Sequence, residues 1–111
     1  KLKDIEISPF EISHDAVMPC GYRIKSNSNT LSFATDLGYV SDEVFDYLSS
    51  SDFVVLEANY DITLLDFGKY PYPTKRRIKG NLGHLSNDDS ALTISRLYKK
   101  RSKKFLISTF K

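Results

Sequence analysis

The run Phe53-Val54-Val55-Leu56 is the feature that most limits how this chain can fold. Four consecutive apolar residues lack the alternation of a half-exposed strand, so the run predicts a strand buried on both faces. It leads directly into Glu57 and Asn59, and polar residues at the exit of a buried strand are well placed for a site at its C-terminal end. We therefore expect a layered α/β domain with a site at this edge of the sheet.

Shorter strands are expected on both sides of this run. Residues 4–7 and 10–13 alternate polar and apolar side chains and are separated by Pro9, while residues 21–25 and 31–35 form a strand, loop, strand unit around a polar loop. A final buried strand is predicted at residues 105–107. Together these segments predict about five strands in a mixed sheet.

Two helices are expected to cover mainly one face of that sheet. Ser41 can act as the N-cap of the first helix, and Ser86 or Asn87 can cap a long helix that ends in a basic segment. A short helix is predicted at 61–67 and a basic helical turn at 74–78, after the break formed by Tyr70-Pro71-Tyr72-Pro73.

Length and charge set limits on the number of domains and on the partners. With 111 residues, 41% of them hydrophobic, we expect a single domain over residues 1–111. The net charge of +2 is too small to imply nucleic-acid binding by itself, and a solvated helix face is the common explanation for basic runs. These runs consist of Lys75, Arg76 and Arg77, and of Lys99, Lys100, Arg101, Lys103 and Lys104.

The lone Cys20 and the lack of an apolar leader or membrane span favour a reducing, cytoplasmic setting.

Two short segments carry residues that could bind a metal ion. His14 and Asp36 each lie where an extended run gives way to a turn, and imidazole and carboxylate both suit zinc or manganese. Neither segment is specific alone, since His14 could be a hydrogen-bonded turn residue and Asp36 an ordinary turn aspartate.

The order of four segments resembles the C-terminal half of metallo-β-lactamase-fold hydrolases, within the WalJ-like nuclease branch. The segments are His14-Asp15-Ala16, Ala34-Thr35-Asp36-Leu37-Gly38, Leu56-Glu57-Ala58-Asn59-Tyr60-Asp61 and Gly83-His84-Leu85-Ser86-Asn87. The resemblance implies half of an αββα sandwich, with a mixed sheet and helices on one face. The His-x-His-x-Asp-His signature of the family's N-terminal half is missing, so we expect a fragment whose apolar sheet face is normally covered by that half.

The resemblance also implies roles for particular residues. His14 and Asp36 are the implied metal ligands, for two zinc or manganese ions in the complete protein. His84 matches a histidine that lies near the scissile phosphate in tRNA 3′-processing nucleases, and is the implied catalytic residue for proton transfer or phosphate contact. The alternative is a loop histidine that caps the following helix. Glu57 and Asn59 are implied to contact the substrate.

The basic segment is a further candidate for substrate binding in the complete nuclease. Lys75, Arg76 and Arg77 would act there as charge partners of substrate phosphates.

Two positions depart from the family pattern. Tyr60 replaces a histidine of the branch's Glu-Ala-Asn-His-Asp segment, and Thr109 falls where members place a last metal-binding histidine. A threonine hydroxyl is a poor replacement for imidazole at zinc, so we expect weak metal binding by the isolated fragment.

The function that we predict is a metal-dependent phosphodiesterase or exonuclease that acts on DNA, incomplete and inactive as this chain alone. A degenerate, non-enzymatic binding domain and a small-molecule hydrolase remain alternatives. A His-x-His-x-Asp-His motif encoded before Lys1 would favour the enzyme over the binding domain.

Overall fold

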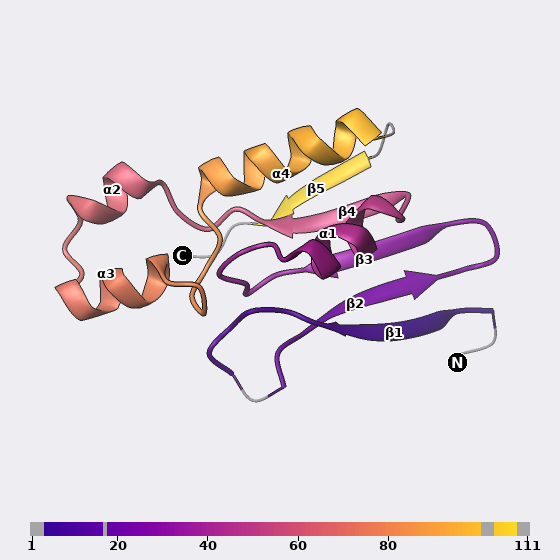
Figure 1. Cartoon of the computed structure of the whole chain (residues 1–111), viewed down its shortest axis with the longest axis horizontal. Coiled ribbons are helices and arrows are strands. Elements are labelled where there is room, and N and C mark those ends of the chain that lie inside the picture. Colours follow the sequence, from indigo (N-terminus) through magenta and orange to yellow (C-terminus); the bar gives the residue numbers. More distant parts are fainter. Residues whose placement is uncertain (1–3, 17, 101–103, 109–111) are drawn as a thin grey trace.

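The computed structural model describes residues 4–16, 18–100 and 104–108. The described chain begins with three strands and then alternates between helices and strands (Figure 1). The strands are β1 (Glu6–Glu11), β2 (Cys20–Lys25), β3 (Thr30–Ala34), β4 (Phe53–Glu57) and β5 (Lys104–Ser108). The helices are α1 (Asp42–Ser49), α2 (Ile62–Asp66), α3 (Tyr72–Lys79) and α4 (Asn87–Lys100).

Within the described residues, the strands form one five-stranded mixed sheet in the order β1-β2-β3-β4-β5. The first three strands pair antiparallel, because short connections return the chain beside itself. From β3 to β5 the pairing is parallel, and the connections carry α1 and then α2 to α4 (Figure 1). The predicted mixed α/β sheet is confirmed.

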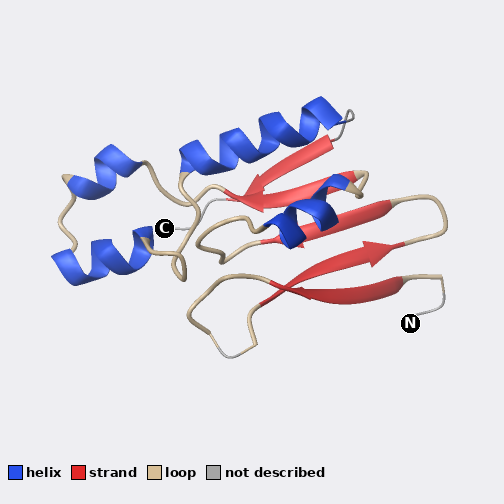
Figure 2. Cartoon of the chain, viewed as in Figure 1, coloured by secondary structure: helices blue, strands red, loops and turns tan. Residues whose placement is uncertain are grey.

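The hydrophobic core lies between α1, α4 and one face of the sheet (Figure 2). Val44 and Leu48 of α1 and Leu97 of α4 are buried against Val54 and Leu56 of β4. Ser41 caps α1 as predicted, since its hydroxyl accepts a hydrogen bond from the Val44 amide. In the described ranges, no helix combines the length and the apolar character that crossing a membrane requires.

The opposite face of the sheet is apolar and open in the described structure. The register places Tyr22 opposite Phe33, and Leu31 opposite Phe53. Ile7 lies opposite Ile24. Because Ile24 is two residues from Tyr22, these side chains share one face of the sheet. The side chains of Ile7, Tyr22, Phe33 and Phe53 are exposed there. This is the apolar sheet face that the sequence predicted for a half-sandwich.

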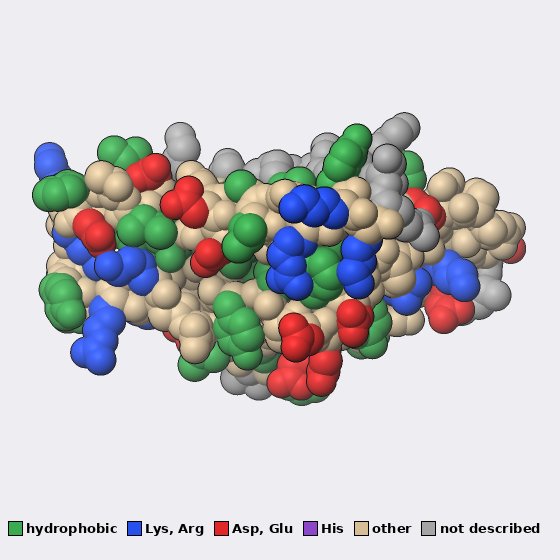
Figure 3. All heavy atoms as spheres, turned by 45° about the horizontal axis from the view of Figure 1, so that its top comes forward, with side chains coloured by type: hydrophobic (Ala, Val, Ile, Leu, Met, Phe, Trp, Pro, Cys, Tyr) green, Lys and Arg blue, Asp and Glu red, His purple; other side chains and the backbone are tan. Residues whose placement is uncertain are grey.

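Two basic side chains of α4, of which only Lys100 belongs to the C-terminal basic run, lie over the ring of Phe45. The guanidinium of Arg96 and the Nζ of Lys100 lie 4.3 and 5.4 Å from the centre of the Phe45 ring. In Figure 3, a group of Lys and Arg side chains lies beside a group of Asp and Glu side chains. Of the run, Lys99 and Lys100 are exposed at the end of α4. Arg101 and Lys103 lie outside the described residues, so a solvated face for the whole run stays a prediction.

Prolines explain two differences from the predicted elements. β1 runs without a break through Pro9, which an edge strand tolerates because one side of its backbone has no ladder partner. α3 begins at Tyr72, not at residue 74, because Pro73 occupies the first turn, where a missing N–H costs no hydrogen bond.

Candidate metal centre

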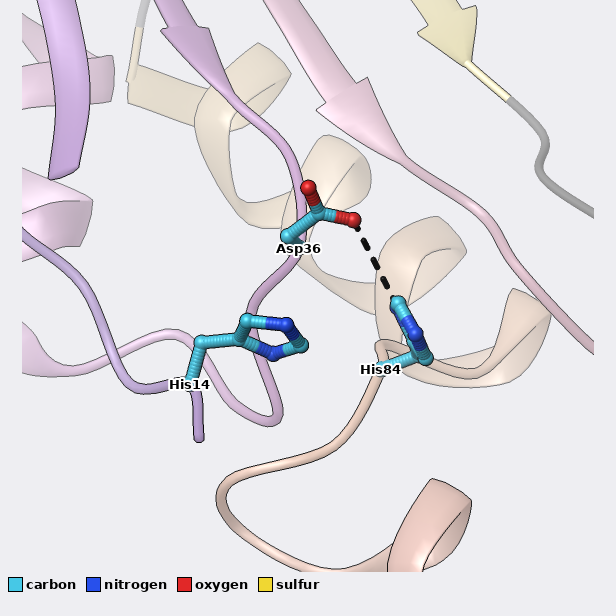
Figure 4. A group of neighbouring side chains, drawn as sticks. All are labelled: His14, Asp36 and His84. Atoms are coloured by element: carbon cyan, nitrogen blue, oxygen red, sulfur yellow. Dashed lines mark ion pairs between the residues drawn. The ribbon is translucent and has the colours of Figure 1, made fainter. Parts of the chain in front are cut away.

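His14, Asp36 and His84 come together at the C-terminal end of the parallel strands (Figure 4). His14 lies in the loop after β1, Asp36 follows β3, and His84 lies in the loop between α3 and α4. Each offers one ligand atom, and these three atoms lie within 4.8 Å of one another. Asp36 has a φ of 58°, a conformation that aspartate adopts more readily than most residues. The structure therefore places the two predicted ligands and the predicted catalytic histidine in one cluster.

Each histidine has one ring nitrogen held by a protein oxygen. The Nδ1 of His14 lies 2.8 Å from the carbonyl oxygen of Gly83, and the Nδ1 of His84 lies 2.7 Å from Oε2 of Glu57. Metal-binding histidines commonly donate one N–H to a carbonyl or carboxylate in this way, which fixes the ring. The other ring nitrogen of His14, Nε2, lies 3.5 Å from Oδ1 of Asp15 and would have to exchange this contact for an ion.

The donor set fits a divalent ion in type and nearly in spacing. Two imidazoles and a carboxylate are ordinary zinc ligands, and ligands on a tetrahedral zinc lie about 3.3 Å from one another. The cluster spans up to 4.8 Å, so small side-chain movements would bring all three atoms to one ion.

Glu57 is the buried centre of this site. Its side chain is 0% exposed, and its oxygens accept four hydrogen bonds from described residues. Oε1 accepts from the amides of Leu37 and Leu85, each at 3.1 Å, and Oε2 accepts from Asn59 Nδ2 and His84 Nδ1. The backbone groups that Glu57 binds are those next to Asp36 and His84. Both carboxylate oxygens of Glu57 thus hold groups beside Asp36 and His84, and its predicted contact with substrate stays a prediction.

The loop that carries His14 is tied to residues 81–83. The Asp15 amide donates to the Leu82 carbonyl at 2.9 Å, and the Ser13 hydroxyl donates to the Asn81 carbonyl. Residues 80–83 in turn fold back so tightly on the end of α3 that a Cβ at Gly83 would collide with the carbonyl oxygens of Arg77 and Ile78. The position of His14 is therefore set by a loop far away in the sequence.

Asp15 joins this loop to α3 through an ion pair with Arg77 Nε. Asp15 is not among the site residues predicted from the sequence, although its position directly after His14 was the available signal. The hydrogen bond from Arg77 is the main cause that lowers the pKa of Asp15 below its usual 3.8, and the pair raises the pKa of Arg77.

Replacing Arg77 with glutamine is expected to return the pKa of Asp15 toward 3.8. A carboxyl with a lowered pKa stabilises the fold above its usual pKa and loses this contribution as the pH falls through the lowered value. The stabilisation by the pair should thus be complete at neutral pH and disappear only below pH 3.8. An NMR titration of the Asp15 carboxyl carbon measures the shift. Arg76→Gln is the control, and an unchanged Asp15 pKa in Arg77→Gln would contradict the assignment.

The predicted phosphate-binding cations divide between two surfaces. Arg77 lines a pocket of about 640 Å³ together with Asp36, His84 and Asn59. Lys75 and Arg76 line a separate depression of about 310 Å³, where Lys75 Nζ donates to the Asp66 carbonyl at 2.7 Å. Successive helix residues point in different directions, so three adjacent cations do not form one patch.

Thr109, the position where family members place a last metal-binding histidine, lies outside the described residues.

Sequence comparison places the chain in the beta-lactamase superfamily. The profile of the beta-lactamase superfamily domain matches residues 1–106, so the chain belongs to this family. Exodeoxyribonuclease WalJ of Streptococcus pneumoniae is 40% identical over 104 residues, which cover 94% of this chain and 39% of WalJ. Exodeoxyribonuclease YycJ of Bacillus anthracis is 40% identical over 92 residues, which cover 83% of this chain and 35% of YycJ. The chain thus spans less than two fifths of these relatives, and the predicted resemblance is confirmed.

Solved structures show the same fold. The metallo-β-lactamase fold protein YhfI of Bacillus subtilis superposes with a TM-score of 0.60 at 14% identity, over 97% of this chain and 48% of YhfI. Zn²⁺-bound PqqB of Methylobacterium extorquens gives a TM-score of 0.52 at 7% identity, over 97% of this chain and 46% of PqqB. The chain therefore has the architecture of about half of a metallo-β-lactamase fold.

Proposed function

We propose that this chain is part of a metal-dependent phosphodiesterase that removes nucleotides from DNA ends. The observation that carries the proposal is the cluster of His14, Asp36 and His84, with His84 fixed by the buried Glu57. The identity to two exodeoxyribonucleases supports DNA as the substrate.

In this proposal, His14 and Asp36 hold the metal and His84 moves a proton. Zinc or manganese, as two ions in the complete protein, would lower the pKa of a bound water and neutralise charge on the phosphate. A carboxylate such as Asp36 has two oxygens and can contact both ions. Glu57 accepts the Nδ1 proton of His84, so Nε2 is left to give or take a proton at the leaving oxygen.

The second half of the fold is the partner that we propose for the apolar sheet face. Ile7, Tyr22, Phe33 and Phe53 are exposed on that face, and the chain covers only 48% of YhfI. An N-terminal half that carries further metal ligands would cover these side chains. This chain alone is then inactive and binds metal weakly, and a cytoplasmic setting remains an expectation from the sequence.

One observation favours a second candidate, a non-enzymatic binding domain. Tyr60 occupies the position of a histidine in the WalJ-like pattern and lines the pocket beside Asp36 and His84. Loss of an imidazole there would be compatible with a domain that keeps the fold and has lost the chemistry.

A nuclease assay on the complete encoded polypeptide tests the proposal. End-labelled DNA should shorten stepwise with Mn²⁺ or Zn²⁺ and stay intact with EDTA, because the metal ligands must be occupied for turnover. Hydrolysis of a small phosphodiester without action on DNA would favour the small-molecule hydrolase. Absence of any hydrolysis, together with the absence of a His-x-His-x-Asp-His motif before Lys1, would favour the binding domain.

A further inference from the structure

The pocket next to the candidate metal centre extends well beyond the residues that the proposed chemistry uses. Asp36 and His84 lie in its wall, which continues through α2, α3 and their connection. Its volume of about 640 Å³ is within the range of about 300–1,000 Å³ that is usual for small-ligand sites. The remaining wall includes Tyr60, Lys69, Tyr70 and Arg77.

Two tyrosines give this wall aromatic surface. Tyr70 lies in the connection between α2 and α3 and is 55% exposed, so its ring is accessible without any change in the fold. Tyr60 is half-buried after β4. Burial, followed by the charges of Asp89, Asp66 and Glu57, raises the pKa of Tyr60, so its hydroxyl stays neutral and can donate a hydrogen bond. Aromatic rings of this kind stack with nucleobases of any sequence.

Two cations share the pocket with these tyrosines. Lys69 is exposed in the same connection, and Arg77 enters the wall from α3. The ion pair with Asp15 uses only Nε of Arg77, and a guanidinium has further N–H donors that can bind phosphate oxygens. Aromatic surface and cations beside a proposed phosphodiesterase centre match the chemistry of a nucleotide.

We propose that this pocket holds the terminal nucleotide of a single-stranded DNA end. The base lies on Tyr70 and Tyr60, the terminal phosphates contact Lys69 and Arg77, and the next phosphodiester reaches Asp36 and His84. A base inside a duplex is stacked on both faces, whereas an unpaired terminal base can offer a face to a tyrosine. This inference rests on the proposed nuclease function, since it names the form of DNA that the same site takes.

The depression on the other side of α3 is the competing surface. It contains Tyr72, Lys75 and Arg76 but measures about 310 Å³, and Lys75 already donates to Asp66. Neither Asp36 nor His84 lies in its wall. A strand bound there would not place its phosphodiester at the candidate metal centre.

Fluorescence anisotropy with the complete protein in EDTA tests the pocket separately from turnover. The probe is a fluorescein-labelled oligothymidylate of about ten nucleotides, within the usual range of single-strand site sizes. Tyr70→Ala should weaken binding about 5- to 100-fold through the loss of base stacking, while Tyr70→Phe should bind like the wild type. Tyr72→Ala is the matched control, because Tyr72 is also exposed but lines only the competing depression.

Several results would overturn the proposal. Wild-type affinity in Tyr70→Ala, or no binding of the probe by any variant, removes the pocket as a nucleotide site. Weakened binding in Tyr72→Ala or in Lys75→Ala with Arg76→Ala, with Tyr70→Ala unaffected, assigns the strand to the competing depression. Equal competition by blunt duplex DNA rejects the single-stranded end.

The two proposals fail in different ways. Tyr70-dependent binding without metal-dependent cleavage supports the pocket and rejects the nuclease. Metal-dependent cleavage whose KM is unchanged by Tyr70→Ala supports the nuclease and rejects the pocket.

Discussion

Replacing Glu57 with alanine is expected to lower the free energy of unfolding by about 3–5 kcal/mol. The change leaves the amides of Leu37 and Leu85 without their buried acceptor and releases His84 and Asn59. Each buried donor that loses its acceptor costs about 1–3 kcal/mol, and partial access of water reduces the sum. Urea denaturation of the wild type and of Glu57→Ala measures the difference in the free energy of unfolding.

Two further variants show whether the effect belongs to the hydrogen bonds. Glu57→Gln keeps the shape but replaces one oxygen by an NH₂ group, which cannot accept, so it should have an intermediate effect. Glu43→Ala removes an exposed carboxylate from α1 and should stay within about 0.5 kcal/mol of the wild type. Equal stability of Glu57→Ala and Glu43→Ala would show that Glu57 does not organise these loops.

His14→Ala and Asp36→Ala are each expected to abolish turnover of the complete protein because the metal is lost. His84→Ala should lower kcat about 10²- to 10⁴-fold, the usual contribution of a proton-transfer group, with metal content nearly unchanged. Metal analysis of the purified variants, combined with the nuclease assay, separates the two kinds of effect.

The metal content of the His84→Ala variant decides whether His84 is a metal ligand or a proton-transfer group outside the coordination shell. Loss of metal in His84→Ala would make His84 a third ligand, as the spacing within 4.8 Å permits. Full activity of the His84→Ala variant would show that His84 takes no part in catalysis. Asp42→Ala, which removes an exposed carboxylate of α1, controls for a general effect of lost charge and should behave as the wild type.

Local patterns were sufficient to predict most of the fold. The apolar run before Glu57 became β4 and Ser41 became the cap of α1, because both signals depend on neighbouring residues alone. The start of α3 and the continuity of β1 were missed because a proline also fits a first helical turn or a sheet edge.

The candidate site was only partly predictable for a related reason. The predicted segments do meet, but the role of Glu57 depends on Leu37 and Leu85, which lie 20 and 28 residues away in the sequence. The division of Lys75, Arg76 and Arg77 between two surfaces depends on the orientation of α3, which no local pattern defines. Contacts between distant segments decide both features.

The buried position of Glu57 also limits how this family of sequences can change. A buried carboxylate is often replaceable by an apolar side chain of similar volume with no loss of stability, provided that its partners change as well. Here two of the partners are backbone amides, which no substitution at Leu37 or Leu85 other than proline removes, and a third is His84. A sequence that drifts away from catalysis is therefore still expected to keep glutamate at position 57, so its presence alone does not distinguish an active enzyme from an inactive descendant.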